Sequence, residues 1–94
     1  MTTMDTLPKC TSLREVLRAN LRAARLLAGL KQAQAARRLG VAMGAVSDWE
    51  RGKFQPSMLK LELIADVYDV PVWLLLKPDG LKPPSALRAR VEVA

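Results

Sequence analysis

Residues Gln32 to Arg51 read QAQAARRLGVAMGAVSDWER, and this stretch decides the fold. The spacing of its apolar residues predicts two short helices that cross steeply on either side of a tight turn. Gly40 suits the turn because glycine accepts a positive φ without strain. Ala36 is small enough for the second helix to pack against it. The wedge between the helices is filled by Ala35, Leu39, Val41, Val46 and Trp49.

The periodicity extends this pair toward the N-terminus. A helix is predicted to begin at Ser12, because Ser12 and Glu15 have the spacing of a capping box, and to end at Gly29. The central pair is predicted to span Gln32 to Leu39 and Met43 to Arg51.

Two more helices are predicted after Lys53. One begins at Pro56-Ser57, and its expected buried face consists of Leu59, Leu63, Ile64 and Val67. The other begins at Val70-Pro71. Residues 12–76 are therefore expected to form an all-α, compact domain of five helices.

The two ends of the chain have a different character. Residues 1–11 lack periodicity and contain Pro8, so we expect a flexible N-terminal arm. Residues 77–94 form a Pro-rich linker and a tail whose last eight residues, LRARVEVA, alternate as in a short β-strand. Because one strand is not stable alone, this segment is predicted to be a dimerisation strand that pairs with a second copy. A frayed tail and a helix docked on residues 72–76 are the alternatives.

The composition excludes several classes of protein. The chain has 94 residues, enough for one domain with a single core. It has no histidine and one cysteine, Cys10, so we expect neither a zinc site nor a Cys–His nucleophile. Without a Gly-rich phosphate loop or a paired-carboxylate site, we expect no enzyme and no cofactor. No run approaches the roughly 18 apolar residues of a membrane span, and a single cysteine is typical of the reducing cytoplasm.

The charge is distributed unevenly along the chain. The net charge is +6, and residues 1–53 carry ten Lys and Arg against four Asp and Glu. Residues 54–76 carry one Lys against three acidic residues. A polyanion is the natural partner of such a basic half, although a solvated basic surface would have the same composition.

Residues 13–76 resemble the lambda-repressor/Cro type of helix-turn-helix protein, also called the XRE family. The resemblance rests on LRAARLLAGLKQAQAARRLGVAMGAVSDWERGKFQPS, with its Gly-Val, Val-Ser-x-Trp-Glu-x-Gly-Lys and Pro-Ser. It implies a lambda-repressor-like fold and a bacterial or phage-encoded transcriptional repressor or regulator in the cytoplasm. Such a protein binds double-stranded DNA sequence-specifically, as a homodimer on a two-half-site operator. The alternatives are an antitoxin that represses its own operon, and a helix-turn-helix scaffold that binds a protein such as a toxin or an antirepressor.

Carried over onto this sequence, the resemblance implies a DNA-binding surface. Gln32 opens the first helix of the motif, where its side chain and the free amides can meet a phosphate. The recognition helix would turn a set of residues toward the major groove, namely Met43, Gly44, Ala45, Ser47 and Asp48. The residues expected to touch the other phosphate strand are Arg51, Lys53 and Gln55. Arg25 and Glu50 occupy positions that form an ion pair in relatives.

This sequence departs from the family at the positions of the recognition helix that are expected to contact bases. Gln, Arg or Ser often stands where Met43 and Gly44 are, and neither Met, Gly nor Ala forms base-edge hydrogen bonds. Met43 or Ala45 can contact a thymine methyl group, Ser47 can donate or accept, and Asp48 can accept from a cytosine amine. Much of the specificity would then come from DNA shape and from the spacing of two half-sites.

Two further expectations concern the helix ends and the core. Lys31 and Ala42 stand where a Ser or Thr often caps the helix, so both short helices should depend more on packing. Trp49 is expected in the core rather than as a platform for stacking bases.

Overall fold

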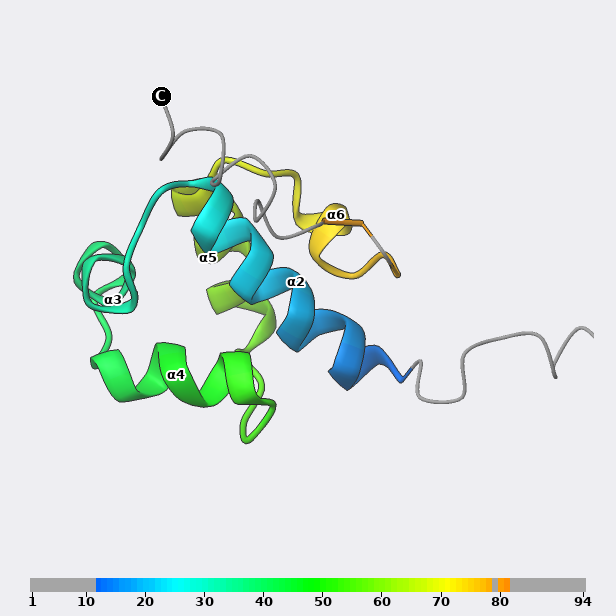
Figure 1. Ribbon diagram of the computed structural model, residues 1–94, viewed down its shortest axis with the longest axis horizontal. Coiled ribbons are helices and arrows are strands. Elements are labelled where there is room, and N and C mark those ends of the chain that lie inside the picture. The colour runs from blue at the N-terminus through cyan, green and yellow to red at the C-terminus, as the bar shows by residue number, and fades with distance from the viewer. Residues whose placement is uncertain (1–11, 79, 82–94) are drawn as a thin grey trace, which may run out of the picture.

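The structure is a computed structural model that describes residues 12–78, 80 and 81, and its regular structure there is entirely helical (Figure 1). The described helices are α2 (Leu13–Leu27), α3 (Gln32–Leu39), α4 (Met43–Arg51), α5 (Met58–Tyr68) and α6 (Val72–Leu75). In Figure 1, α2 crosses the molecule with α3 on one side and α6 on the other. The predicted all-α fold of five helices is confirmed. The predicted arm of residues 1–11 and the predicted strand of residues 87–94 lie outside the described residues.

The first described helix, α2, begins and ends near the predicted residues. The Ser12 hydroxyl accepts from the backbone N–H of Glu15 at 3.2 Å, and Gly29 has a positive φ of 76° just after the last turn. The other half of the capping box was predicted wrongly. The Glu15 carboxylate accepts instead from Arg18 Nε at 2.8 Å, because an arginine three residues later lies on the same face of the helix.

The turn between α3 and α4 is the one that the sequence predicts. Gly40 has a φ of 72° in the left-handed region, and the N–H of Val41 donates to the carbonyl of Ala36 at 3.0 Å. The predicted wedge residues Ala35, Leu39, Val46 and Trp49 are buried, and Val41 packs against them. Lys31 and Ala42 give no side-chain cap, although the Gln34 side chain accepts from the N–H of Lys31 at 2.8 Å.

The buried face of α5 was predicted correctly only in part, because Ile64 is buried and Val67 packs against the core. Its buried residues are Leu61, Ile64, Ala65 and Tyr68, whereas Leu59 is 78% exposed and Leu63 is 38% exposed. Both stripes have helical spacing and share Ile64, so periodicity alone does not choose between them. Packing against α2, α3 and α6 selects the stripe with the smaller Ala65 and the ring of Tyr68.

The short helix α6 depends on a buried asparagine of α2. Asn20 is 2% exposed. Its Nδ2 donates to the carbonyl oxygens of Leu74, Leu75 and Lys77 at 3.2, 2.9 and 2.9 Å. A helix of four residues is not stable in isolation, so these bonds and the burial of Leu75 hold α6 against α2. This contact was not predicted from the sequence.

Candidate nucleic-acid interface

One side of the helix α4 packs against the rest of the domain, and the other side is exposed to solvent. Its buried residues are Val46, Trp49 and Glu50, and it packs on α3 and α2. Of the side chains predicted to face the major groove, Met43 is 54% exposed, and Ser47 is half-buried. Ala45 packs against the core, so it is less available to a thymine methyl group than predicted.

Two of the predicted DNA-binding residues contact each other. Arg51 Nη2 donates to Asp48 Oδ1 at 2.8 Å, and the two side chains are 66% and 24% exposed. Asp48 therefore accepts from a residue of its own helix, one turn further on. Separate roles were predicted for these residues, although their three-residue spacing is a signal for such a pair.

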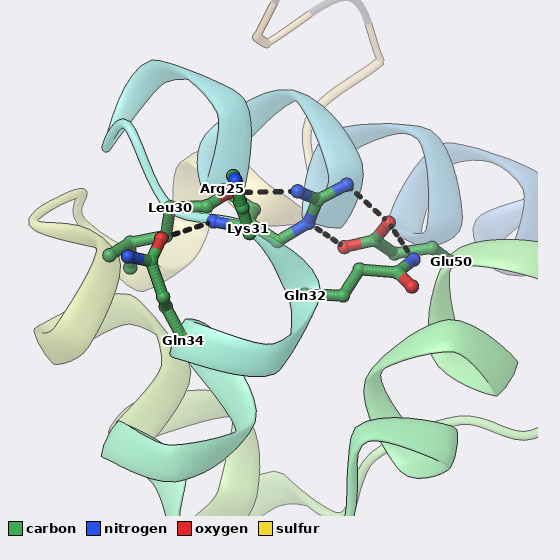
Figure 2. Close-up of polar contacts among 6 residues, drawn as sticks. All are labelled: Arg25, Leu30, Lys31, Gln32, Gln34 and Glu50. Carbon is green, nitrogen blue, oxygen red and sulfur yellow. Dashed lines mark hydrogen bonds and ion pairs between the residues drawn. The ribbon is translucent and has the colours of Figure 1, made fainter.

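Gln32 is turned toward the interior of the motif. Its Nε2 donates to Glu50 Oε1 at 3.1 Å (Figure 2). One of its two amide hydrogens is thus used to join α3 to α4. The predicted phosphate contact at this position would then come from the second amide hydrogen and from the first backbone amides of α3, which have no partner within a helix.

The predicted partners Arg25 and Glu50 form a buried ion pair with two hydrogen bonds (Figure 2). Arg25 Nε lies 2.6 Å from Glu50 Oε2, and Nη2 lies 3.0 Å from Oε1. Arg25 Nη1 also donates to the carbonyl of Leu30 at 2.8 Å. The residues are 7% and 6% exposed. Because Gln32 shares Glu50, this network fixes α4 relative to α2 and α3.

Tyr68 lies within the electrostatic influence of this network. Burial, and then the nearby Glu50 carboxylate, raise the pKa of its phenol, the Arg25 guanidinium partly offsets the increase, and together they bring it to about 12. The phenol is consequently protonated and uncharged at neutral pH, so it adds no negative charge beside Glu50.

The loop after α4 gathers basic and polar side chains. Lys53 and Gln55 are exposed, as a phosphate contact requires, and Lys53 Nζ lies 5.8 Å from the centre of the Phe54 ring. The Arg18 side chain from α2 passes over Gly52, where an added Cβ would lie 2.9 Å from Arg18 Cδ. Arg18 thus brings a cation of α2 to the end of α4, a placement that periodicity does not reveal.

Within residues 12–78, 80 and 81, no three His, Cys, Asp or Glu side chains are arranged to hold a metal ion. None of the described helices is long and apolar enough to cross a membrane. In the same part of the chain, every buried side-chain nitrogen or oxygen has a hydrogen-bond partner.

Comparison with known proteins gives consistent results. The helix-turn-helix family model matches residues 21–72. A hypothetical transcription factor from Neisseria, NHTF, is 28% identical with a TM-score of 0.70, covering 94% of this chain and 92% of that one. The clp gene regulator ClgR from Corynebacterium glutamicum is 30% identical with a TM-score of 0.67, covering 86% of this chain and 84% of that one. No curated protein matches the sequence.

Proposed function

Because the chain belongs to the XRE-type helix-turn-helix family of DNA-binding transcription regulators, we propose that it represses transcription by binding a specific duplex operator. The observation that carries the proposal is the fixed, outward-facing helix α4. Its inner side is anchored by Val46, Trp49 and the Glu50 ion pair, and its outer side is free to enter a major groove.

The contacts divide into two classes. Positioning contacts to phosphates come from the first turn of α3 with Gln32 and from the loop with Lys53 and Gln55. Direct contacts to bases come from the outer side of α4, with Met43 against a thymine methyl group and Ser47 as donor or acceptor.

A single copy reads too little DNA for useful specificity. The nine residues of α4 span roughly 13 Å, which corresponds to only a few base pairs. The protein therefore acts as a homodimer on two half-sites about 34 Å apart. The C-terminal residues 87–94 supply the dimerisation strand in this proposal.

A protein partner is the second candidate, and the exposed apolar side chains favour it. Met58 is 76% exposed, Leu59 78% and Trp73 59%. Neighbouring exposed apolar side chains mark protein contacts more often than single ones, and Met58 and Leu59 are adjacent at the start of α5. A toxin or an antirepressor that binds there would make the chain an antitoxin or a regulated repressor, while α4 keeps its role on DNA.

The test is selection of bound duplexes from a random pool, followed by titration of the selected duplex at several salt concentrations. The logarithm of the binding constant should fall linearly with the logarithm of the salt concentration, with a slope of about −0.9 for each phosphate contacted. Lys53→Ala should reduce this slope by about one contact, whereas Lys77→Ala, an exposed lysine outside the motif, should leave it unchanged. No enrichment, or binding that is insensitive to salt, would overturn the proposal.

A further inference from the structure

The outward centre of α4 consists of three residues. At about 100° per residue, Gly44, Asp48 and Arg51 lie on the side opposite the buried Val46 and Trp49. Gly44 has no side chain, and a Cβ added there would meet nothing in the described part of the chain within 4 Å. The helix can therefore approach a groove closely at Gly44, and the next functional groups on that side belong to Asp48 and Arg51.

The ion pair between Asp48 and Arg51 leaves most of the hydrogen-bond donors of Arg51 free. One donor, Nη2, is directed at Asp48 Oδ1 at 2.8 Å, and the Arg51 side chain is 66% exposed. A guanidinium carries five N–H donors in a planar fork, so donors remain for a second acceptor. Asp48 also limits the orientations of a long, flexible side chain before DNA is bound, which reduces the entropy that binding must overcome.

The remaining donors suit a base better than a phosphate. The Asp48 carboxylate cancels the charge of Arg51, and a neutralised cation gains little from a phosphate anion. Guanine presents two acceptors, O6 and N7, at the edge exposed in the major groove, and arginine matches them with two parallel hydrogen bonds. No other residue on the outward centre of α4 has a comparable set of donors.

We propose that Asp48 and Arg51 act as one guanine-reading unit. Arg51 donates to O6 and N7 of a guanine, and Asp48 is a positioning residue that holds the guanidinium and touches no base. This inference rests on the proposed function, because it assigns the specificity of the same DNA-binding helix. It differs from separate roles, in which Asp48 would accept from a cytosine amine and Arg51 would neutralise a phosphate.

A double-mutant cycle on the selected duplex tests the unit. The proteins are the wild type, Asp48→Ala, Arg51→Ala and the double variant. Each is titrated against the selected duplex and against duplexes with another base pair in place of each preferred G·C pair. At one G·C position, the ratio of affinities for the selected and the substituted duplex should fall about tenfold in each single variant. In the double variant this ratio should fall no further than in either single variant.

Arg51→Lys supplies a further readout that a purely structural role would not alter. Lysine keeps the charge but lacks the planar fork, so the guanine preference should fall about tenfold while the salt slope stays the same. The matched controls are Arg22→Ala on α2 and Glu62→Ala on α5, both exposed. Each removes one charge of the same sign as Arg51 or Asp48, and neither should change the preference.

Three results would overturn the inference while duplex binding persists. If Asp48→Ala changes the preferred base at a position where Arg51→Ala does not, Asp48 reads that base itself. If Asp48→Ala tightens binding to every duplex equally, the carboxylate only repels DNA. If the losses of the single variants add in the double variant, the residues act independently. If the wild type binds no duplex, the proposed function fails together with the inference.

Discussion

Breaking the buried ion pair between Arg25 and Glu50 should destabilise the fold severely. The perturbation is Glu50→Leu, which leaves the Arg25 guanidinium buried with the Leu30 carbonyl but without a carboxylate. An uncompensated buried charge typically costs about 3–5 kcal/mol, whereas a domain of this size has a total stability of roughly 5–15 kcal/mol. Arg25→Met should have a comparable effect, because it leaves the Glu50 carboxylate buried with Gln32 as a neutral donor.

Removing both charges together should cost less than removing either one. In Arg25→Met/Glu50→Leu no charge remains buried at this site. The Leu30 carbonyl then loses its Arg25 donor, and Gln32 loses its acceptor. An unpaired buried polar group costs about 1–3 kcal/mol, and the half-buried Gln32 can turn to water, so the double variant should lose about 1–3 kcal/mol in total.

The assay is urea unfolding followed by far-UV circular dichroism. The matched control is Glu15→Ala, which breaks the exposed ion pair with Arg18, whose side chains are 45% and 42% exposed. That pair should contribute no more than about 1 kcal/mol. If Glu50→Leu lost no more stability than this control, or if the losses from the two single variants added in the double variant, the shielded pair would not be what fixes α4.

Three other predictions can be measured. Because the pKa of Tyr68 is about 12 in the folded chain against an ordinary value of 10.0 for tyrosine, the folded state binds this proton more tightly, and stability should fall as pH rises from about 10 through about 12. Tyr68→Phe should lack that component of the fall in a series of urea midpoints. Asn20→Leu removes the donor to the last carbonyls of α6, so hydrogen exchange should become faster at Leu75 and Leu76 before it does in α3. Deletion of residues 85–94 should convert a dimer into a monomer by light scattering and weaken operator binding, and an unchanged mass would assign dimerisation to another surface.

The α3–α4 pair could be predicted from the sequence because the residues that determine it lie close together in the chain. The bounds of α3 and α4 match the prediction, since Gly40 and Gly52 stop the helices through backbone conformations that glycine adopts readily. The burial of Trp49 followed from its spacing relative to Val46. Each of these features depends on residues within a few positions of one another.

The features of the fold and of the candidate site that were not predicted mostly depend on contacts between elements that are distant in the sequence. Nothing near Asn20 in the sequence shows that it will meet the carbonyls of α6, more than fifty positions later. The direction of the Gln32 side chain is likewise set by Glu50 across the turn. The face of α5 was ambiguous because two apolar stripes share Ile64. Asp48 and Arg51 differ from these cases, since their pairing is local and their spacing was a readable signal.

The central claim is that the α3–α4 unit is the surface that binds duplex DNA, and a titration of ¹⁵N-labelled protein with the selected duplex tests it most directly. We predict that the perturbed backbone amides cluster at Gln32 and Ala33, along Met43–Arg51, and at Lys53 and Gln55. Amides on the outer side of α5, such as Glu62, Leu63 and Asp66, should stay unchanged. Perturbations confined to that side of α5, with the signals of α4 unmoved, would contradict the account.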